Sequence, residues 1–139
     1  MRYIKIKSEK FVTNESKGTV TCIMEYDCKD AFEEGLAVVL SPWGIDRLMR
    51  RLGCKAIDAP NKTGFEVACT ARCTGGDVFD ETLGRYIAKD KCTVRLLDVD
   101  CRLSLKISDE LYRLISRNQE KRVEDIDLRS RIIDRLRKC

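Results

Sequence analysis

Eight cysteines are the residues of this 139-residue chain that most readily suggest chemistry, and the chain contains no histidine. No two cysteines are spaced as Cys-x-x-Cys, whereas structural zinc sites usually combine such pairs, often with histidine. The N-terminus, MRYIKIKSEK, lacks the apolar core of a signal peptide, so an extracellular disulfide framework is not expected. The sequence therefore predicts no metal site, no cofactor, and reduced, mostly buried thiols that pack as small hydrophobic groups. The cysteines are Cys22, Cys28, Cys54, Cys69, Cys73, Cys92, Cys101 and Cys139.

The missing histidine also restricts the reactions that the chain can perform. Histidine is the usual proton-transfer group near neutral pH. Without it, Ser–His and Cys–His nucleophile pairs are excluded within the chain. A carboxylate or lysine mechanism stays open, but no motif indicates one. We therefore expect a protein that acts by binding and is not an enzyme.

Positive charge is concentrated in the second half of the chain. Residues 1–83 hold 12 Lys+Arg against 13 Asp+Glu, and residues 84–139 hold 15 against 10. An anionic partner is therefore expected to bind the second half, with an ordinary solvated surface as the alternative. The cations expected to contact a partner are Arg129, Arg131, Arg135 and Arg137, together with Arg47, Arg50 and Arg51.

The composition is that of a folded domain with a highly charged surface. Hydrophobic residues make up 43% of the chain and charged residues 36%. No apolar run approaches the ~20 residues that a membrane-spanning helix needs. We expect a cytoplasmic protein that does not enter a membrane.

Three segments have the alternation and composition of β-strands. Residues 2–12 and 18–27 are separated by the turn sequence TNESKG, which predicts a β-hairpin. Residues 64–73 place Phe65, Val67 and Ala71 on one face of a third strand, together with Cys69 and Cys73.

Two helices are predicted between and after these strands. The first covers about 42–52, with Ser41 as its cap, Pro42 in its first turn and an apolar face formed by Trp43, Leu48 and Leu52. The second covers about 81–91, with Asp80 as its cap and Phe79 packing on Leu83. We expect a connector or short helical turn at 28–35, a short apolar run at 36–40, and a loop punctuated by Pro60, Asn61 and Gly64.

Residues 92–107 fit either a helix or a strand. Strict alternation favours a strand from about 99 to 107, after a helix that ends near 96. Ser108 then caps a helix with Asp109 and Glu110 in its first turn, and the polar segment RNQEKR separates this helix from a last one near 125–138. The expected fold is α+β, with an antiparallel sheet of three to four strands packed against helices and two C-terminal helices. Residues 1–98 would form the core domain, and 99–139 a strand-helix-helix segment packed on it.

The segment RLSLKISDELYRLI, followed by VEDIDLRSRIIDRL, resembles the ribbon-helix-helix repressors over about residues 99–138. In that family a strand pairs with its twin across a dimer and reads the major groove of DNA. Carried over by this resemblance, the groove-reading residues would be Arg102, Ser104 and Lys106. This chain lacks the glycine and small capping residue that the family commonly shows between its helices.

Residues 71–91 resemble a segment of small phage and prophage proteins of unknown role. The matching positions are Cys73, Asp77, Phe79, Asp80, Gly84 and Ala88. These residue types have structural roles. Asp77 or Asp80 would cap the helix, Phe79 would fill the junction between strand and helix, and the small residues Gly84 and Ala88 would let helix and sheet approach closely. The resemblance implies a non-catalytic phage or mobile-element protein that inhibits a host nucleic-acid-handling defence machine, in the manner of an anti-CRISPR protein. Its expected partner is a host protein or ribonucleoprotein such as a CRISPR nuclease, and the alternative is a dimeric DNA-binding repressor.

Overall fold

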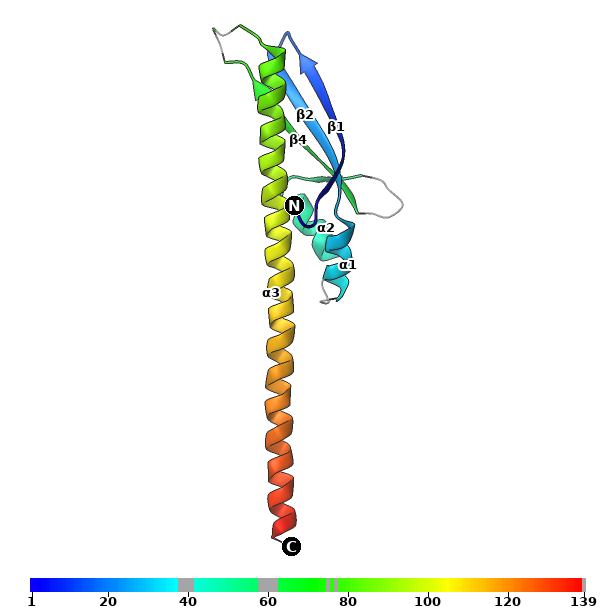
Figure 1. Ribbon diagram of the computed structural model, residues 1–139, viewed down its shortest axis with the longest axis vertical. Helices are drawn as coiled ribbons and strands as arrows, with labels where there is room; N and C mark the ends of the chain where they lie inside the picture. Colours follow the sequence, from blue (N-terminus) through cyan, green and yellow to red (C-terminus); the bar gives the residue numbers. More distant parts are fainter. Residues whose placement is uncertain (38–41, 58–62, 75, 77, 139) are drawn as a thin grey trace.

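The computed structural model describes residues 1–37, 42–57, 63–74, 76 and 78–138, and it confirms the α+β class (Figure 1). Four antiparallel strands lie in the order β1-β2-β4-β3. One helix, α3, lies against the sheet and continues far beyond it (Figure 1). The elements are β1 (Lys5–Asn14), β2 (Thr19–Asp27), α1 (Lys29–Ala37), α2 (Pro42–Arg51), β3 (Lys55–Ala56), β4 (Gly64–Arg72) and α3 (Glu81–Arg137).

The predicted β-hairpin of β1 and β2 is confirmed, with Phe11 opposite Cys22 and Gly18 at a φ of 62° in the turn. Strand β1 begins three residues later than expected because the residues before it bind α3 instead. The backbone N–H groups of Arg2, Tyr3 and Ile4 donate to the Asp100 carboxylate over 3.2, 2.7 and 3.2 Å. A helix residue thus fixes the start of the chain.

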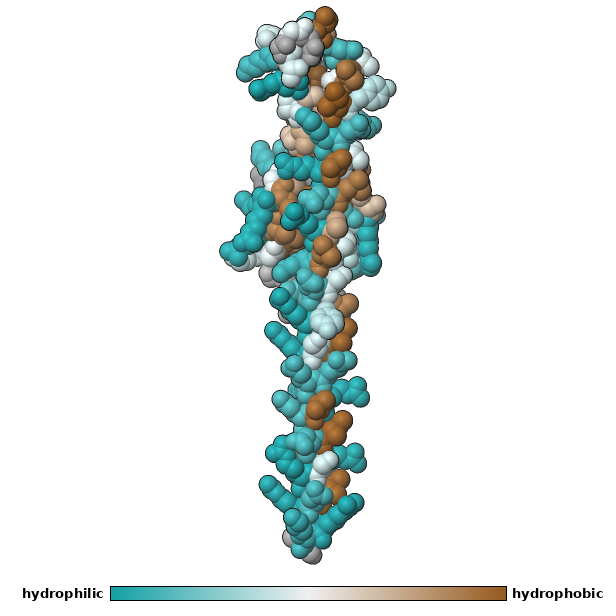
Figure 2. Space-filling view, turned by 90° about the vertical axis from the view of Figure 1, so that its left-hand side faces the viewer, coloured by the Kyte–Doolittle hydropathy of each residue, from teal (hydrophilic) through white to brown (hydrophobic). Residues whose placement is uncertain are grey.

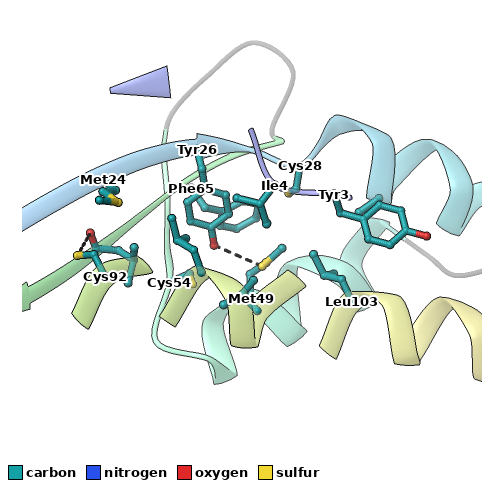
Figure 3. Packing of buried hydrophobic residues seen from close by; sticks show 14 of the residues in the cluster. Tyr3, Ile4, Met24, Tyr26, Cys28, Met49, Cys54, Phe65, Cys92 and Leu103 are labelled. Atoms are coloured by element: carbon teal, nitrogen blue, oxygen red, sulfur yellow. Dashed lines mark hydrogen bonds between the residues drawn. The ribbon is translucent and has the colours of Figure 1, made fainter. Parts of the chain in front are cut away.

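Strands β2 and β4 supply the sheet's half of the hydrophobic core. The predicted strand at 64–73 is confirmed by β4, in which Phe65, Val67 and Ala71 are buried. The Tyr26 hydroxyl donates to Met49 Sδ over 3.5 Å, and the Cys92 thiol of α3 donates to the Cys22 carbonyl over 3.3 Å (Figure 3). Buried residues also alternate along β2: Val20, Cys22, Met24 and Tyr26.

Two helices lie between β2 and β3. The connector expected at 28–35 is the helix α1, and the predicted helix near 42–52 is confirmed by α2. The apolar face predicted for α2 is only partly correct, because Ile45 and Met49, four residues apart, are its buried side chains, whereas Trp43 is 64% exposed. Residues 38–41, with the expected cap Ser41, lie outside the described part of the chain, as do Pro60 and Asn61 in the predicted loop.

The start of α3 follows the prediction closely. Asp80 is the N-cap, and its carboxylate accepts a hydrogen bond from the backbone N–H of Leu83 over 3.1 Å. A Cβ atom at Gly84 would lie 2.7 Å from Val20 Cγ2, and Ala88 is fully buried one turn later. Small residues therefore allow α3 to pack closely on β2. Asp77 lies outside the described residues.

The strand expected at 99–107 is wrong, because these residues belong to α3. The misleading alternation arises because two rows of apolar side chains on opposite sides of one helix interleave in the sequence. Val99, Leu103 and Ile107 are buried against the rest of the domain, whereas Leu97 and Leu105 are 51% and 60% exposed. The buried positions of α3, which we call the core row, are Ala88, Cys92, Leu96, Val99, Leu103 and Ile107.

The prediction of two separate C-terminal helices is also wrong. Helix α3 has 57 residues and runs through Ser108, the expected cap, and through the polar segment at 117–122. It also crosses the domain boundary expected at residue 98. Charged pairs one turn apart, such as Asp98–Arg102 at 3.2 Å and Lys106–Glu110 at 3.4 Å, support the continuous helix.

The contact between Gly84 and Val20 predicts that Gly84→Ala destabilises the native protein but stabilises a Val20→Ala variant. Gly84→Ala is expected to lower the free energy of unfolding by about 1–2 kcal/mol, because the added methyl group overpacks the junction of α3 and β2. In a Val20→Ala background, the same change is expected to stabilise by about 0.5–1 kcal/mol, because alanine favours the helix over glycine. Urea denaturation of the four variants measures both values, and equal effects in the two backgrounds would contradict the contact.

Candidate interaction surface

An open groove of about 490 Å³ lies between β1 and the first turns of α3, and its charged side chains neutralise one another. Arg85 binds Glu81 at 2.8 Å and lies over the Phe11 ring at 5.3 Å, while Lys89 binds Glu9 at 3.4 Å. The hydrogen bonds that Glu81 accepts from Arg85 and Thr13 hold the pKa of its carboxyl below the usual value. Glu81 therefore stays ionised near neutral pH and is poorly suited to proton transfer there.

A second group of charged residues holds the N-terminal segment in place. The Tyr3 hydroxyl donates to Glu34 Oε2 over 2.5 Å, and Arg2 donates to Glu34 Oε1 over 3.0 Å. Burial, together with the bond to Glu34, raises the pKa of Tyr3 to about 12, while the hydrogen bonds from Tyr3 and Arg2 lower the pKa of Glu34. These pKa shifts favour the protonated phenol and the ionised carboxyl that this arrangement needs.

The thiols show burial rather than metal-binding geometry. Within the described residues, no group of three or more Cys, Asp or Glu side chains is placed to hold a metal ion. Burial raises the pKa of Cys22, Cys28, Cys54 and Cys92, which disfavours the reactive thiolate. Cys101, by contrast, is exposed on α3.

The three residues expected to read a DNA groove lie on a helix. Arg102 pairs with Asp98, and Lys106 pairs with Glu110, each one helical turn away. Side chains two residues apart on a helix point in different directions, so Arg102, Ser104 and Lys106 do not form the single face that a ribbon strand would present. The groove-reading role is therefore not retained.

The seven arginines expected at a partner interface form two separate groups. Arg47, Arg50 and Arg51 lie on α2, and the residue after this helix is joined to the first third of α3 by a hydrogen bond of 3.4 Å from Arg95 to the Leu52 carbonyl. Arg47 covers the Trp43 ring at 4.2 Å, and Arg50 binds Asp46 at 2.9 Å. The second group, about 50 Å further along α3, comprises Arg129, Arg131, Arg135 and Arg137.

The C-terminal group lies on a part of α3 that we call the arm, residues 108–137. Ile107 is the last buried residue of the helix, so the arm extends about 45 Å past the core (Figure 1). Arg131 binds Asp127, one turn earlier on the same helix. Residues 129–138 contain five cations and one carboxylate, which makes the tip of the arm positive. Leu128, Ile132 and Leu136, one turn apart and 46–70% exposed, form a second row on the arm beside Arg131 and Arg135.

A longer apolar row follows α3 on the side opposite the core row, and we call it the outer row. Figure 2 views this side and shows hydrophobic side chains along most of the length of the helix. Polar residues interrupt the row at Asp90, Ser108, Gln119 and Ser130. Its exposed apolar members, between 41% and 72% exposed, are Leu83, Ile87, Val94, Leu97, Leu105, Tyr112, Ile115, Val123 and Ile126, and Cys101 and Ile133 occupy two further positions.

Comparison with protein-family models, with curated proteins and with solved structures finds no match. Among the described helices, none combines the length and the hydrophobicity that crossing a bilayer requires. The candidate surface therefore depends on the geometry of α3 alone. Sequence reasoning identified the arginines and missed the outer row, although steps of three and four residues from Leu83 to Ile133 would have revealed it.

The buried thiols predict a loss of stability at alkaline pH. Burial raises the pKa of Cys28 from 9.0 to about 12, so this thiol contributes stability that is fully present below pH 9 and is lost as the pH rises toward 12. Between pH 8 and about 10.5 its share of the loss is expected to be about 2 kcal/mol. Urea denaturation at both pH values measures the fall, which should be smaller in Cys28→Ala. An equal fall in the variant would contradict this assignment.

Proposed function

We propose that this protein is a non-catalytic binding protein that engages a macromolecular partner through the arm of α3. The observation that supports this proposal is the continuation of a single helix for thirty residues past its last buried position, Ile107. Isolated helices gain little stability in water, and long helices are usually stabilised by packing of an apolar face. The arm exposes several large apolar side chains instead, and exposed apolar surface of this kind typically marks a binding site.

The chemistry of the arm indicates which partner it suits. The second row, Leu128, Ile132 and Leu136, supplies apolar contact area, and Arg131 and Arg135 lie beside it. Arginine is favoured both at protein interfaces and for binding phosphate or carboxylate groups. An acidic protein surface with an apolar centre, or a protein bound to nucleic acid, would complement this arrangement.

The resemblance of residues 71–91 to phage proteins suggests the biological setting of such binding. In that setting the protein would inhibit a host nucleic-acid-handling defence machine, with the arm occupying a surface of that machine. In the part of the chain before the arm, residues 1–107, which we call the head, buried thiols and carboxylates that are paired with cations support action by binding rather than by turnover. The identity of the host target stays a prediction from the resemblance.

Affinity capture from a bacterial lysate tests the arm as the binding surface. The test variant carries Arg131→Gln, Arg135→Gln and Arg137→Gln, which removes three arm cations while keeping good helix formers. The matched control carries Lys5→Gln, Lys7→Gln and Lys10→Gln, three exposed cations of β1. We expect the native chain and the control to capture the same protein, and the arm variant to recover at least about tenfold less, which corresponds to 1.4 kcal/mol.

Nuclease treatment of the lysate distinguishes the two kinds of partner. A captured protein that persists after the treatment indicates direct contact with protein, whereas its loss indicates that nucleic acid bridges the two. Undiminished capture by the arm variant would contradict the proposal, as would substrate turnover by the purified chain that is abolished by replacing one acidic residue or one thiol.

A further inference from the structure

The outer row of α3 is a long apolar feature that the core leaves uncovered. Its fifteen positions from Leu83 to Ile133 recur on average about every 3.6 residues, the period of a straight α-helix, so they stay on one side of α3 throughout. Only one of these positions, Asp90, carries a charge. We propose that the outer row is the interface of a parallel homodimer, in which a second copy of this chain packs its own α3 alongside. This dimer goes beyond the partner binding assigned to the arm.

The size of the outer row matches the needs of a specific dimer. From Leu83 to Ile133 the row is about 75 Å long, and a strip of helix about 10 Å wide gives roughly 750 Å² per chain. A standard stable interface buries roughly 800 Å² per partner. Two such rows meeting along their full length would therefore bury enough surface for a stable pair.

The shape of the molecule leaves this side of α3 accessible. Most of the sheet, α1 and α2 lie on the other side of the helix, where the core row packs, whereas the end of β4 and the turn after it lie beside Leu83 and Ile87 at the first turns of α3 (Figure 1). The face seen in Figure 2 is correspondingly covered by neither the sheet nor the two short helices. A second α3 can thus approach the row from Val94 onward, and it meets the exposed parts of Leu83 and Ile87 beside the turn that follows β4.

Charged residues on either flank of the row favour a parallel pair. Near the C-terminus, Arg122 and Arg129 lie on one flank, while Asp127 and Asp134 lie on the other. In a parallel, in-register pair of helices, a residue on the first flank faces the partner residue five positions further along. Arg122 then meets the partner's Asp127, and Arg129 meets the partner's Asp134, which gives four ion pairs in the symmetric dimer.

The antiparallel arrangement brings like charges together at two places. If the two rows were centred on each other, Asp98 would lie beside the partner's Glu120 and Asp109 beside the partner's Asp109, while Lys91 would lie beside the partner's Asp127. Like charges at such flanking positions oppose association. The second row, Leu128, Ile132 and Leu136, stays outside the parallel pair on each arm, where it is available to the partner assigned above.

Sedimentation equilibrium of the purified full chain over a range of concentrations tests the dimer. The native protein is expected at about 32 kDa, twice its chain mass of 16.0 kDa. Leu105→Glu combined with Ile126→Glu places two charges in the outer row and is expected to weaken dimerisation at least about 100-fold. Leu128→Glu, a matched change at an exposed leucine of the second row, should leave the mass at the dimer value, and circular dichroism establishes that each variant stays helical.

Cross-linking of Cys101 tests the orientation of the two chains. Parallel packing places the two Cys101 thiols side by side, so mild oxidation by diamide is expected to join them by a disulfide, while an antiparallel pair centred on the row would separate them by about 20–25 Å. The experiment uses a Cys139→Ser chain and a Cys101→Ser control, with the linked peptides identified by mass spectrometry. A monomeric native protein, a dimer that tolerates the outer-row charges, or a dimer without the Cys101 link would overturn the proposal.

Discussion

The packing of the core row of α3 on β2 and β4 is the interaction on which the rest of the molecule depends. A four-stranded antiparallel sheet exposes an apolar face that must be covered, and here a single helix covers most of it. Leu96, Val99 and Leu103 are fully buried in this contact. At its upper end, the absence of a side chain at Gly84 lets the helix approach Val20. The same contact therefore sets both the stability of the head and the direction of the arm.

Because α3 is continuous, its packing on the sheet also fixes the position of the arm, which does not contact the sheet. The arm has no core of its own, so its position follows from the head only as long as the helix does not break after Ile107. Ion pairs across this junction and along the arm, such as Lys106–Glu110 and Arg131–Asp127, favour the helical conformation by a few tenths of a kcal/mol each. These contributions are modest, and packing of a partner along the outer row would add to them.

The sequence was sufficient to predict those elements that are specified by one hydrophobic period or by one capping residue. The hairpin, β4, α2 and the Asp80 cap all have a single period or a single capping residue, and the structure confirms them. It was insufficient at 99–107 because two rows with a period of 3.6, placed on opposite sides of a helix, reproduce the period of 2 that identifies strands. Residues 99–107 alone fit both a strand and a helix, and the apolar steps of three and four residues that continue before and after them favour the helix. The arginines of the candidate surface were predicted from their charge. The sequence alone gave no indication that the group on α2 and the group near the end of α3 lie about 50 Å apart.

The two rows of α3 lie on opposite sides of one helix and have different surroundings. One side of the helix completes the core, while much of the opposite side is exposed, so the surface that we propose for binding lengthens with the helix without altering the fold. In the head, buried thiols and paired carboxylates satisfy packing and charge. Substitutions in the core row are therefore expected to act on stability first, whereas substitutions in the outer row or at the tip act on association with little effect on the folded head. On the proposals made above, folding and binding depend on opposite sides of the same helix.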